Sequence, residues 1–484
     1  MPSLGPAAAD PESLHLRRAS YLLLPCLVLL CVTLPHLGQG DFRRDTGRYA
    51  AISHYLWTGG DFLTPSMGPD HPYMNKPPLA LWIHGWFLKV FGMNLVAARI
   101  PSILAALGTL SLSILTVRQL GSRAEAVVSG LVLALTYEFF RRTREISLDF
   151  WQLCFIMLAV YLFALGLRLN SAFRVALSGI GIGLALLCKP FVALGVIPVL
   201  AAWALIAKRP RLVTALLLAA VPLAVLIAFP WHYHMYLKYG PAFVRQYVFH
   251  EVIARAQGEN GRAPVYYYIV QLASTYWPWL LGVVWAVYQR FSRVKTVRRS
   301  DRDLVLLGGI WAVWVFLGIS LFADKSPNYA LPLYPMLSWV VAAGLCRVPW
   351  PKVGAWYRTG FKGLAPATAA LLVVLSLAPI RFQEGPNKDS QALLAWMKTN
   401  SLSAPTFAGA DVKPNDRCYF YVQTRWWLPE AERREGCDWI LVPRGTNEPN
   451  PQAIAAFTGK NFRVIAATNW PQPPTTPGRE VRKD

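Results

Sequence analysis

Apolar runs long enough to span a membrane alternate with short polar segments along most of this chain. A bilayer core of about 30 Å needs roughly 20 apolar residues in a helix. About eleven such windows occur, near residues 21–37, 95–117, 123–140, 149–168, 173–188, 190–206, 211–230, 268–290, 303–322, 328–346 and 361–380. The pattern predicts an α-helical polytopic membrane domain over residues 1–380.

Two of these windows allow a second interpretation. The first run follows Arg17 and Arg18 and is typical of a membrane helix that starts in the cytoplasm, but a cleaved signal peptide is the alternative. Only Lys189 and Pro190 separate the runs 173–188 and 190–206, so these form either a hairpin or one kinked helix. The second choice would reverse the orientation of every later segment.

The sequence changes character after residue 380. Mixed polar sequence with short apolar strands, such as Trp439 to Val442 and Phe462 to Ala466, predicts a small soluble α/β domain over residues 381–470. The remaining residues, 471–484, are rich in Pro and Thr and end in charges, which predicts a disordered tail.

Composition supports the membrane interpretation and orients the chain. With 54% hydrophobic residues and 15% charged residues, a soluble chain of 484 residues would expose too much apolar surface. The net charge of +22 comes from basic clusters between apolar runs, which favours membrane orientation over nucleic-acid binding. With these clusters in the cytoplasm, four polar segments share the outer, periplasmic face: residues 40–92, 141–149, 231–268 and 324–329.

Carboxylates in two of these segments are candidate catalytic residues. Asp45 precedes a stretch in which Tyr49, Ile52 and Leu56 recur at helical spacing, which predicts an amphipathic helix on the membrane surface. Asp149 opens a predicted membrane helix. For each residue taken alone, capping of a helix N-terminus is the competing interpretation.

Basic residues on the same face are candidates for binding an anionic group. Lys76 stands before two prolines and an amphipathic stretch, where it either reaches the interface or holds a lipid phosphate. Arg141, Arg142, Arg144 and Glu145 crowd one short segment, and arginines clustered on the outer face usually meet an anion.

The last two outer segments add further polar side chains. Segment 231–268 carries His250 and Arg255 among many tyrosines, which an interfacial aromatic belt partly explains. A divalent metal at His250 is a weak hypothesis, because no ligand pair with recognisable spacing accompanies it. Lys325 and Tyr329 stand at the mouth of a proline-interrupted helix, where they either pack or line a cavity.

Cysteines and nucleotide motifs add little chemistry. Seven cysteines occur without a CxxC pair, and only Cys418 and Cys437, in the predicted outer domain, are candidates for a disulfide. No Gly-rich phosphate loop or dinucleotide fingerprint is present, so ATP or a nucleotide-sugar donor is not indicated. The absence of N-x-S/T sequons favours a bacterial inner membrane over the secretory pathway.

The chain resembles the GT-C glycosyltransferases that use lipid-linked sugars, and among them the bacterial lipid A aminoarabinose transferases and the protein mannosyltransferases. The resemblance runs from about Asp45 to Pro335 and rests on DTGRYA, NKPPLALW, AARIPS, SLDFW, CKPFVAL, FHEVIAR and KSPNYALPLYP. It implies a GT-C fold in the membrane. Two positions depart from the family pattern: Asn75 replaces a frequent Glu before Lys-Pro-Pro, and Thr46 replaces a frequent acidic residue.

The resemblance also implies roles for individual residues. Asp45 is expected to be the principal catalytic carboxylate and Asp149 the second one. Lys76 and Arg255 are expected to hold the phosphate of the polyprenyl carrier. The remaining expected donor-site residues are Arg48, Tyr49, Arg144, Lys325 and Tyr329.

The expected reaction moves a sugar from polyprenyl phosphate to an acceptor hydroxyl or phosphate, such as that of a lipid A-like glycolipid, with inversion. A carboxylate for the acceptor and cations for the departing phosphate match this chemistry. Transfer to a protein, as in O-mannosylation, or to a polysaccharide remains open. A lipid or sugar transporter is the rival from another class, although transporters place ionisable residues near the membrane midplane. A third interpretation, a structural scaffold for the cell envelope, does not explain the paired carboxylates of the outer face.

Overall fold

In the computed structural model the chain divides into two compact units, formed by residues 1–39 with 74–382 and by residues 40–73 with 383–484. The structure describes residues 11–38, 46–58, 61–66, 72–258, 262–291, 299–346, 396, 399–400, 407–409, 439–443, 455–458 and 462–466. The predicted helix at 361–380, the cysteines Cys418 and Cys437, and the tail 471–484 lie outside these residues.

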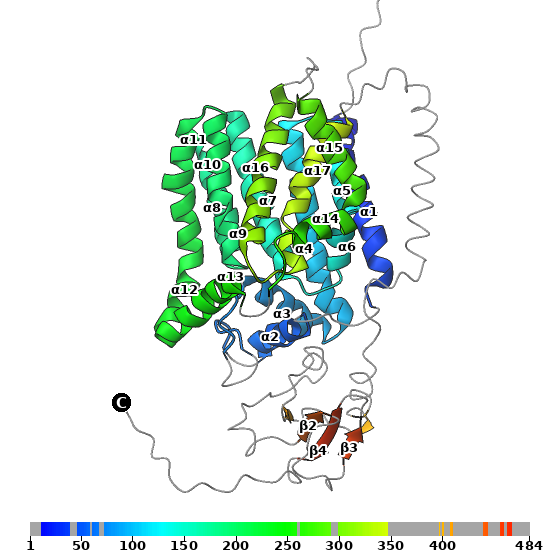
Figure 1. The fold of residues 1–484 in the computed structure, drawn as a ribbon, viewed down its shortest axis with the longest axis vertical. Coiled ribbons are helices and arrows are strands. Elements are labelled where there is room, and N and C mark those ends of the chain that lie inside the picture. Colours follow the sequence, from blue (N-terminus) through cyan, green and yellow to red (C-terminus); the bar gives the residue numbers. More distant parts are fainter. Residues whose placement is uncertain are drawn as a thin grey trace, which may run out of the picture. The chain divides into compact units, whose positions relative to one another are not determined.

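The described part of the first unit is helical (Figure 1). Its α-helices are α1 (Pro11–Thr33), α3 (Leu79–Phe91), α4 (Leu95–Leu120), α5 (Arg123–Ala134), α6 (Tyr137–Arg142), α7 (Leu148–Leu169), α8 (Ala172–Leu186), α9 (Pro190–Leu194), α10 (Val196–Ile206), α11 (Pro210–Ala215), α12 (Val221–Val244), α13 (Arg255–Gln257), α14 (Tyr267–Thr275), α15 (Trp277–Phe291), α16 (Arg299–Leu321) and α17 (Leu333–Leu345). Leu216–Ala220 and Arg245–Ala254 are π-helical, whereas Leu34–His36 and Pro327–Ala330 are 3-10 turns.

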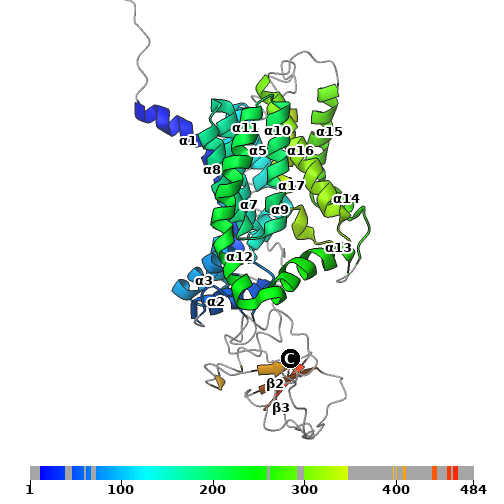
Figure 2. The same cartoon turned by 90° about the vertical axis from the view of Figure 1, so that its left-hand side faces the viewer.

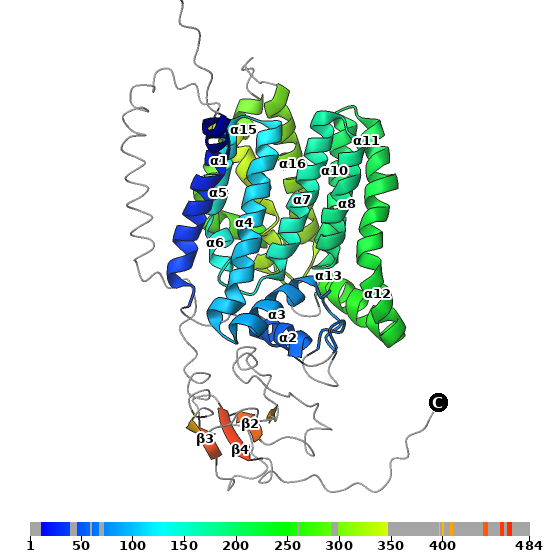
Figure 3. The same cartoon turned by 180° about the vertical axis from the view of Figure 1, so that it is seen from behind.

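Length and composition allow four of the described helices to cross a membrane: Leu95–Leu120, Leu148–Leu169, the continuous Pro210–Glu251 and Leu304–Leu321. Six shorter apolar helices accompany them. Their buried faces form one large core, in which α4 packs against α7 (Figure 3) and α16 and α17 pack together. The described residues therefore form a helical membrane bundle, as the apolar pattern predicted.

Side-chain caps set several helix boundaries. The Asn94 side chain accepts a hydrogen bond from the backbone N–H of Ala97 at the start of α4. Ser122 and Glu125 form a capping box at the start of α5. Asn170 ends α7 in the left-handed conformation, which Asn tolerates better than most residues. Such caps satisfy backbone groups that the helix itself leaves unpaired.

The runs 173–188 and 190–206 form a hairpin, with α9 and α10 as its broken second arm. Lys189, between the arms, contacts Asp149 at the start of α7. At the far end of the second arm, Arg209 donates to the Asn170 side chain, which lies just before the first arm. The chain therefore runs from the C-terminal end of α7 to its N-terminal end at Lys189 and back again at Arg209. The two runs form a hairpin, and the alternative of one kinked helix is wrong.

Segment 231–268 was expected to be an extramembrane loop, but its first half is helical. The helix α12 continues to Val244, and the π-helix follows to Ala254. Gly240 interrupts the helical geometry, because its φ of 54° and ψ of −136° form a backbone conformation that favours glycine. The chain bends there and crosses the end of the bundle toward α13 (Figure 2). Trp231, Phe243 and Tyr247 pack against one another across this bend, so these aromatic residues form a local core as well as the expected interfacial belt.

The second unit contains α2 (Thr46–Thr58), the predicted amphipathic helix, and a four-stranded sheet. Its strands are β1 (Phe407–Gly409), β2 (Trp439–Pro443), β3 (Ala455–Thr458) and β4 (Phe462–Ala466), in the order β1-β2-β4-β3. β1 pairs parallel with β2, and the other two pairs are antiparallel. The two apolar segments expected to be strands are β2 and β4.

Small residues let helices approach closely at the hairpin. A Cβ added to Gly179 in α8 would lie 2.2 Å from the backbone oxygen of Ala220, and one added to Gly181 would lie 2.5 Å from the backbone nitrogen of Ala159. Contacts this short exclude any side chain. The arrangement is typical of membrane helix pairs, which use glycine to pack backbone against backbone.

We expect Gly179→Ala to destabilise the bundle by about 1–3 kcal/mol, because the new methyl group forces α8 away from residues 216–220. Thermal unfolding of the purified protein in detergent measures this as a lower midpoint. Gly309→Ala is the matched control, since a Cβ at Gly309 meets nothing within 4 Å. Equal midpoints for the two variants would contradict the packing argument.

Candidate active site

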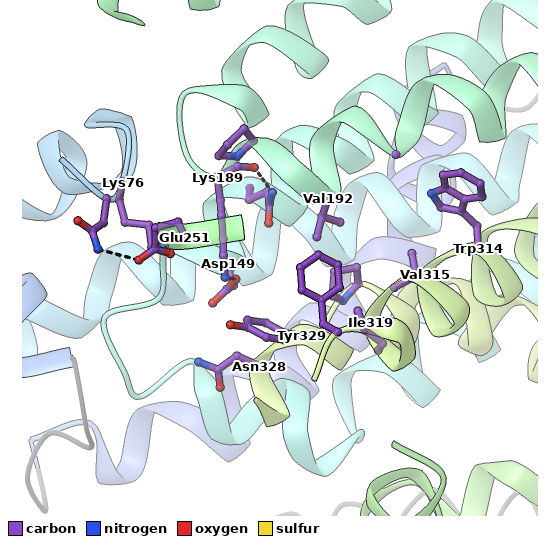
Figure 4. A pocket seen from close by; sticks show the side chains of 17 residues that line it. Lys76, Asp149, Lys189, Val192, Glu251, Trp314, Val315, Ile319, Asn328 and Tyr329 are labelled. Atoms are coloured by element: carbon purple, nitrogen blue, oxygen red, sulfur yellow. Dashed lines mark hydrogen bonds and ion pairs between the residues drawn. The ribbon is translucent and has the colours of Figure 1, made fainter. Parts of the chain in front are cut away.

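A cavity of about 170 Å³ lies within the first unit, where helix ends and connecting turns meet (Figure 4). Its polar side chains come from the segment before α3, the start of α7, the α8–α9 turn, the π-helix and the 3-10 turn before α17. The lining residues are Asn75, Lys76, Asp149, Gln152, Lys189, Pro190, Val192, Gly195, Glu251, Trp314, Val315, Gly318, Ile319, Phe322, Asn328, Tyr329 and Pro332. Residues between Asn75 and Pro332 in the sequence thus build a single site.

Asp149 faces the cavity and is not the cap of its helix. Ser147 caps α7 by accepting a hydrogen bond from the backbone N–H of Phe150. The Asp149 carboxylate instead accepts a hydrogen bond from the Lys189 ammonium at 2.7 Å, with each side chain 18% exposed. The capping interpretation of Asp149 is therefore wrong, and its carboxylate is available to the cavity.

Contacts of both its backbone and its ammonium hold Lys189 in place. Its backbone is extended before Pro190, and its carbonyl accepts a hydrogen bond from the Gln152 side chain one turn along α7. Its ammonium also lies 5.0 Å from the centre of the Tyr329 ring, a cation–π distance. Asp149, Lys189 and Tyr329 thus form one connected group from three distant segments.

Lys76 forms the second ion pair of the cavity. Its ammonium pairs with the Glu251 carboxylate, and both residues are buried. Asn75 donates to the other oxygen of Glu251 at 2.8 Å and accepts from Gln246 at 2.9 Å. A buried lysine needs such a partner, so Lys76 is not an interfacial residue that extends into water.

The opposite wall of the cavity is apolar. Val192 follows the α8–α9 turn, whereas Trp314, Val315 and Ile319 lie on α16 (Figure 4). A site with charged pairs on one side and an apolar wall on the other suits an amphiphilic ligand with an anionic head and a hydrocarbon chain.

Lys325 supports the wall of the cavity without lining it. Its ammonium donates to the carbonyls that end α16, at 2.7 Å to Ser320, and lies 5.7 Å from the Tyr268 ring. Partial desolvation lowers the pKa of Lys325. Gln271 donates to the Pro327 carbonyl at 3.1 Å. These contacts hold the turn that presents Tyr329 to the cavity.

Two arginines of the cluster form ion pairs with neighbouring carboxylates of the protein. Arg141 bonds to Glu138 and Glu145, each at 3.0 Å, and Arg142 pairs with Glu138 at 2.7 Å. Burial alone would raise the pKa of Glu138, but the two guanidinium groups hold it below its usual range. This internal neutralisation explains the burial of Arg141 and Arg142 without an external anion.

Arg144 is buried away from the cavity. Its guanidinium donates to the Val32 carbonyl at 2.6 Å, and desolvation lowers the pKa of Arg144 to about 10. It does not line the cavity. Arg144 thus connects the segment between α6 and α7 to α1, which is a structural role.

The other sequence candidates lie elsewhere or outside the described residues. Asp45 lies outside them. Arg48 and Tyr49 are half-buried on α2 in the second unit, where Tyr49 packs edge-on against Tyr73. Arg255 begins α13, shortly after the π-helix that carries Glu251.

The residues around the cavity do not fit a resident metal site. His250 is exposed, and among the described residues no group of three or more His, Cys, Asp or Glu side chains is placed to hold a metal ion. Asn75, at the position where the family often has Glu, donates its N–H to Glu251. The weak metal hypothesis at His250 thus gains no structural support.

Three residues that line the cavity were not predicted from the sequence to belong to the site: Gln152, Lys189 and Glu251. Lys189 was treated only as a turn between apolar runs, although a lysine flanked by membrane-length helices is itself a signal of a buried ion pair. Glu251 stood among several cations, and nothing in the sequence paired it with Lys76, 175 residues away.

Comparison with known proteins supports the resemblance seen in the sequence. Residues 75–234 match the family described as dolichyl-phosphate-mannose-protein mannosyltransferase. An undecaprenyl phosphate-alpha-4-amino-4-deoxy-L-arabinose arabinosyl transferase of Edwardsiella ictaluri is 28% identical over 370 residues, which cover 74% of this chain and 66% of that protein. The Pseudomonas aeruginosa (strain UCBPP-PA14) protein of that name is 27% identical, over 76% of this chain and 67% of its own length. The matched region thus spans about two thirds of these relatives.

Solved structures share the fold. ArnT from Cupriavidus metallidurans, crystallised with undecaprenyl phosphate, superposes with a TM-score of 0.71 over 94% of this chain and 100% of that one, at 18% identity. The archaeal oligosaccharyltransferase AglB from Archaeoglobus fulgidus gives a TM-score of 0.53 over 90% of this chain and 70% of its own. The expected similarity to GT-C enzymes is confirmed in the fold. The likeness in sequence to the arabinosyl transferases supports a glycosyltransferase that uses a lipid-linked sugar.

We expect the Asp149–Lys189 pair to be coupled in stability. Replacing either partner, in Asp149→Asn or Lys189→Met, removes the opposite charge from a largely buried group and costs about 1–3 kcal/mol. The double variant removes both charges and should melt at a higher temperature than either single variant. Arg168→Met, which breaks an exposed bond to Gln119, is the control and should change the midpoint little. Additive losses in the double variant would refute the coupling.

Proposed function

We propose that this chain is a membrane glycosyltransferase that moves a sugar from polyprenyl phosphate to a hydroxyl or phosphate of a lipid A-like glycolipid at the periplasmic face of a bacterial inner membrane. The observation that carries the proposal is the cavity itself. Two lysine–carboxylate pairs face an apolar wall inside a helical membrane bundle. The likeness to aminoarabinose transferases supports a polyprenyl-phosphate-linked sugar as the donor.

In the proposed reaction, an acceptor oxygen attacks the anomeric carbon from the face opposite the phosphate. The bond between that carbon and the phosphate oxygen breaks, and the phosphate departs with the electron pair. The acceptor proton passes to a carboxylate. Because the attack and the departure take place on opposite faces of the anomeric carbon, the sugar is transferred with inversion. A polyprenyl phosphate leaves as an anion, and cations placed beside it lower the barrier to its departure.

Individual residues take the roles that their chemistry allows. We assign the acceptor proton to Asp45, and Asp149 orients the acceptor from the cavity. Lys76 and Arg255 hold the departing phosphate, with Tyr329 beside Lys189 at the same end of the cavity. The apolar residues of α16 face the first isoprene units of the carrier.

The mass spectrum of envelope glycolipids tests the proposal. We expect deletion of the gene to remove one sugar mass from a glycolipid, and the intact gene to restore it. Asp45→Asn should fail to restore that mass, because loss of the general base lowers the rate by about 10²–10⁴-fold. Asp61→Asn is the matched control, since it changes the same charge in the same segment, and the amide oxygen of Asn can still accept hydrogen bonds from the backbone of Leu63 and Thr64.

Unchanged glycolipids after deletion would refute the proposed acceptor. A loss from glycoproteins in the same samples would indicate protein transfer instead. Full restoration by Asp45→Asn, at matched protein levels, would remove Asp45 from the catalytic role while leaving the transferase proposal intact.

Labelling of single cysteines tests the proposed orientation. In a variant without the seven natural cysteines, new cysteines at positions 70 and 257 should react in intact cells with a membrane-impermeant maleimide. Lys208→Cys is the control, because Lys208 is exposed beside Arg209 at the opposite end of the α8–α10 hairpin. It should react only after the cells are broken. The reverse labelling pattern would place the cavity on the cytoplasmic side.

A further inference from the structure

The segment before α3 and the π-helix are joined by a continuous polar network. Gln246 donates to the Asn75 carboxamide oxygen at 2.9 Å, and the Asn75 amide donates to one Glu251 oxygen at 2.8 Å. The other Glu251 oxygen pairs with the Lys76 ammonium. Asn75 and Lys76, which are adjacent in the segment before α3, thus both bind the Glu251 carboxylate of the π-helix.

The π-helical backbone makes this network possible. In an α-helix, residues five apart point about 140° away from each other, since each residue turns the chain by roughly 100°. In a π-helix the backbone bonds run from residue i to i+5, so residues five apart lie nearly above one another. Gln246 and Glu251 are five apart in the π-helix Arg245–Ala254 and therefore both reach Asn75. The unusual backbone aims Glu251 at Lys76.

The Lys76–Glu251 pair lies at the cavity and is almost completely enclosed. Lys76 is 6% exposed and Glu251 is 7% exposed, yet both line the cavity. A phosphate that approaches the Lys76 ammonium therefore meets the Glu251 carboxylate at the same position. Two anions then compete for one cation in a medium that screens charge weakly.

We propose that Glu251 is a built-in competitor for the donor phosphate, a positioning residue that holds the Lys76 ammonium before the donor binds and takes it back after transfer. This inference rests on the proposed function, because it requires Lys76 to bind the phosphate. When the phosphate arrives, the Lys76–Glu251 ion pair opens and a Lys76–phosphate pair forms, with no covalent change. Glu251 keeps its hydrogen bond from Asn75 and stays in reach.

This competition has a use in the catalytic cycle. After transfer, the carrier leaves as a phosphate monoester with more negative charge than the donor, and strong cation binding would trap it. The Glu251 carboxylate offers Lys76 a replacement partner, so the product dissociates more easily. Product release limits the rate of many enzymes, and weaker product binding then raises turnover.

Binding of undecaprenyl phosphate to the full-length protein in lipid nanodiscs tests the inference. The variants are Lys76→Ala, Glu251→Gln and the double variant. Glu251→Gln removes the competing charge but keeps an oxygen for Asn75, so we expect undecaprenyl phosphate to bind about 3–10-fold more tightly, a change of roughly 1 kcal/mol. Lys76→Ala should bind at least about tenfold more weakly, and the double variant should match it, since the competition acts only through Lys76.

Two further variants make the test decisive. Glu125→Gln changes a buried carboxylate in the α5 capping box and should leave binding unchanged. Glu251→Asp draws the carboxylate back by one methylene and should also tighten binding, by less than Glu251→Gln. It serves as the primary variant if Glu251→Gln does not fold.

The outcomes separate the inference from the proposed function. Weaker or unchanged binding in the Glu251 variants, together with weaker binding in Lys76→Ala, overturns the competitor role and leaves the phosphate site intact. Unchanged binding in Lys76→Ala overturns the phosphate site itself. In turnover assays, tighter product binding in Glu251→Gln should lower kcat and KM together, whereas a purely structural defect raises KM.

Discussion

A charged side chain buried among apolar helices needs an opposite charge beside it, and the cavity end of this bundle is arranged around that constraint. Lys189 meets Asp149 across 40 residues of sequence, and Lys76 meets Glu251 across 175. Each pair joins segments that the chain otherwise keeps apart. Because an unpaired buried charge costs several kcal/mol, these contacts fix how the connecting segments pack over the helix ends.

In the proposed reaction, the ion pairs that make burial possible also supply the charged groups for catalysis. Together they bring two cations and two carboxylates to one small cavity, so the site is close to neutral while its charges remain concentrated. A departing phosphate needs cations, and an acceptor hydroxyl needs a carboxylate. In the proposed mechanism, both come from ion pairs that already exist and open when substrate binds, so the protein buries no further charge of its own.

Irregular backbone occurs where these groups are presented. Lys189 has an extended backbone before Pro190, and Glu251 lies on a π-helix. Tyr329 lies on a 3-10 turn that Tyr268, Gln271 and Lys325 hold in place. Regular helices supply the rigid frame and the apolar wall. Short departures from α-helical geometry aim the polar side chains, as π-helical segments often do at functional sites.

The sequence by itself determined the membrane class, the approximate positions of the described helices and the polar segments between them, because hydrophobic periodicity is a local property. It also marked Asp149, Lys76 and Tyr329 as candidates. Only the tertiary structure decided which charges meet. It paired the arginines Arg141 and Arg142 with neighbouring glutamates, gave Arg144 and Lys325 backbone partners, and brought Lys189 and Glu251 into the cavity. Whether a charge is neutralised or available depends on distances of a few ångströms between remote segments, and these distances are set by packing.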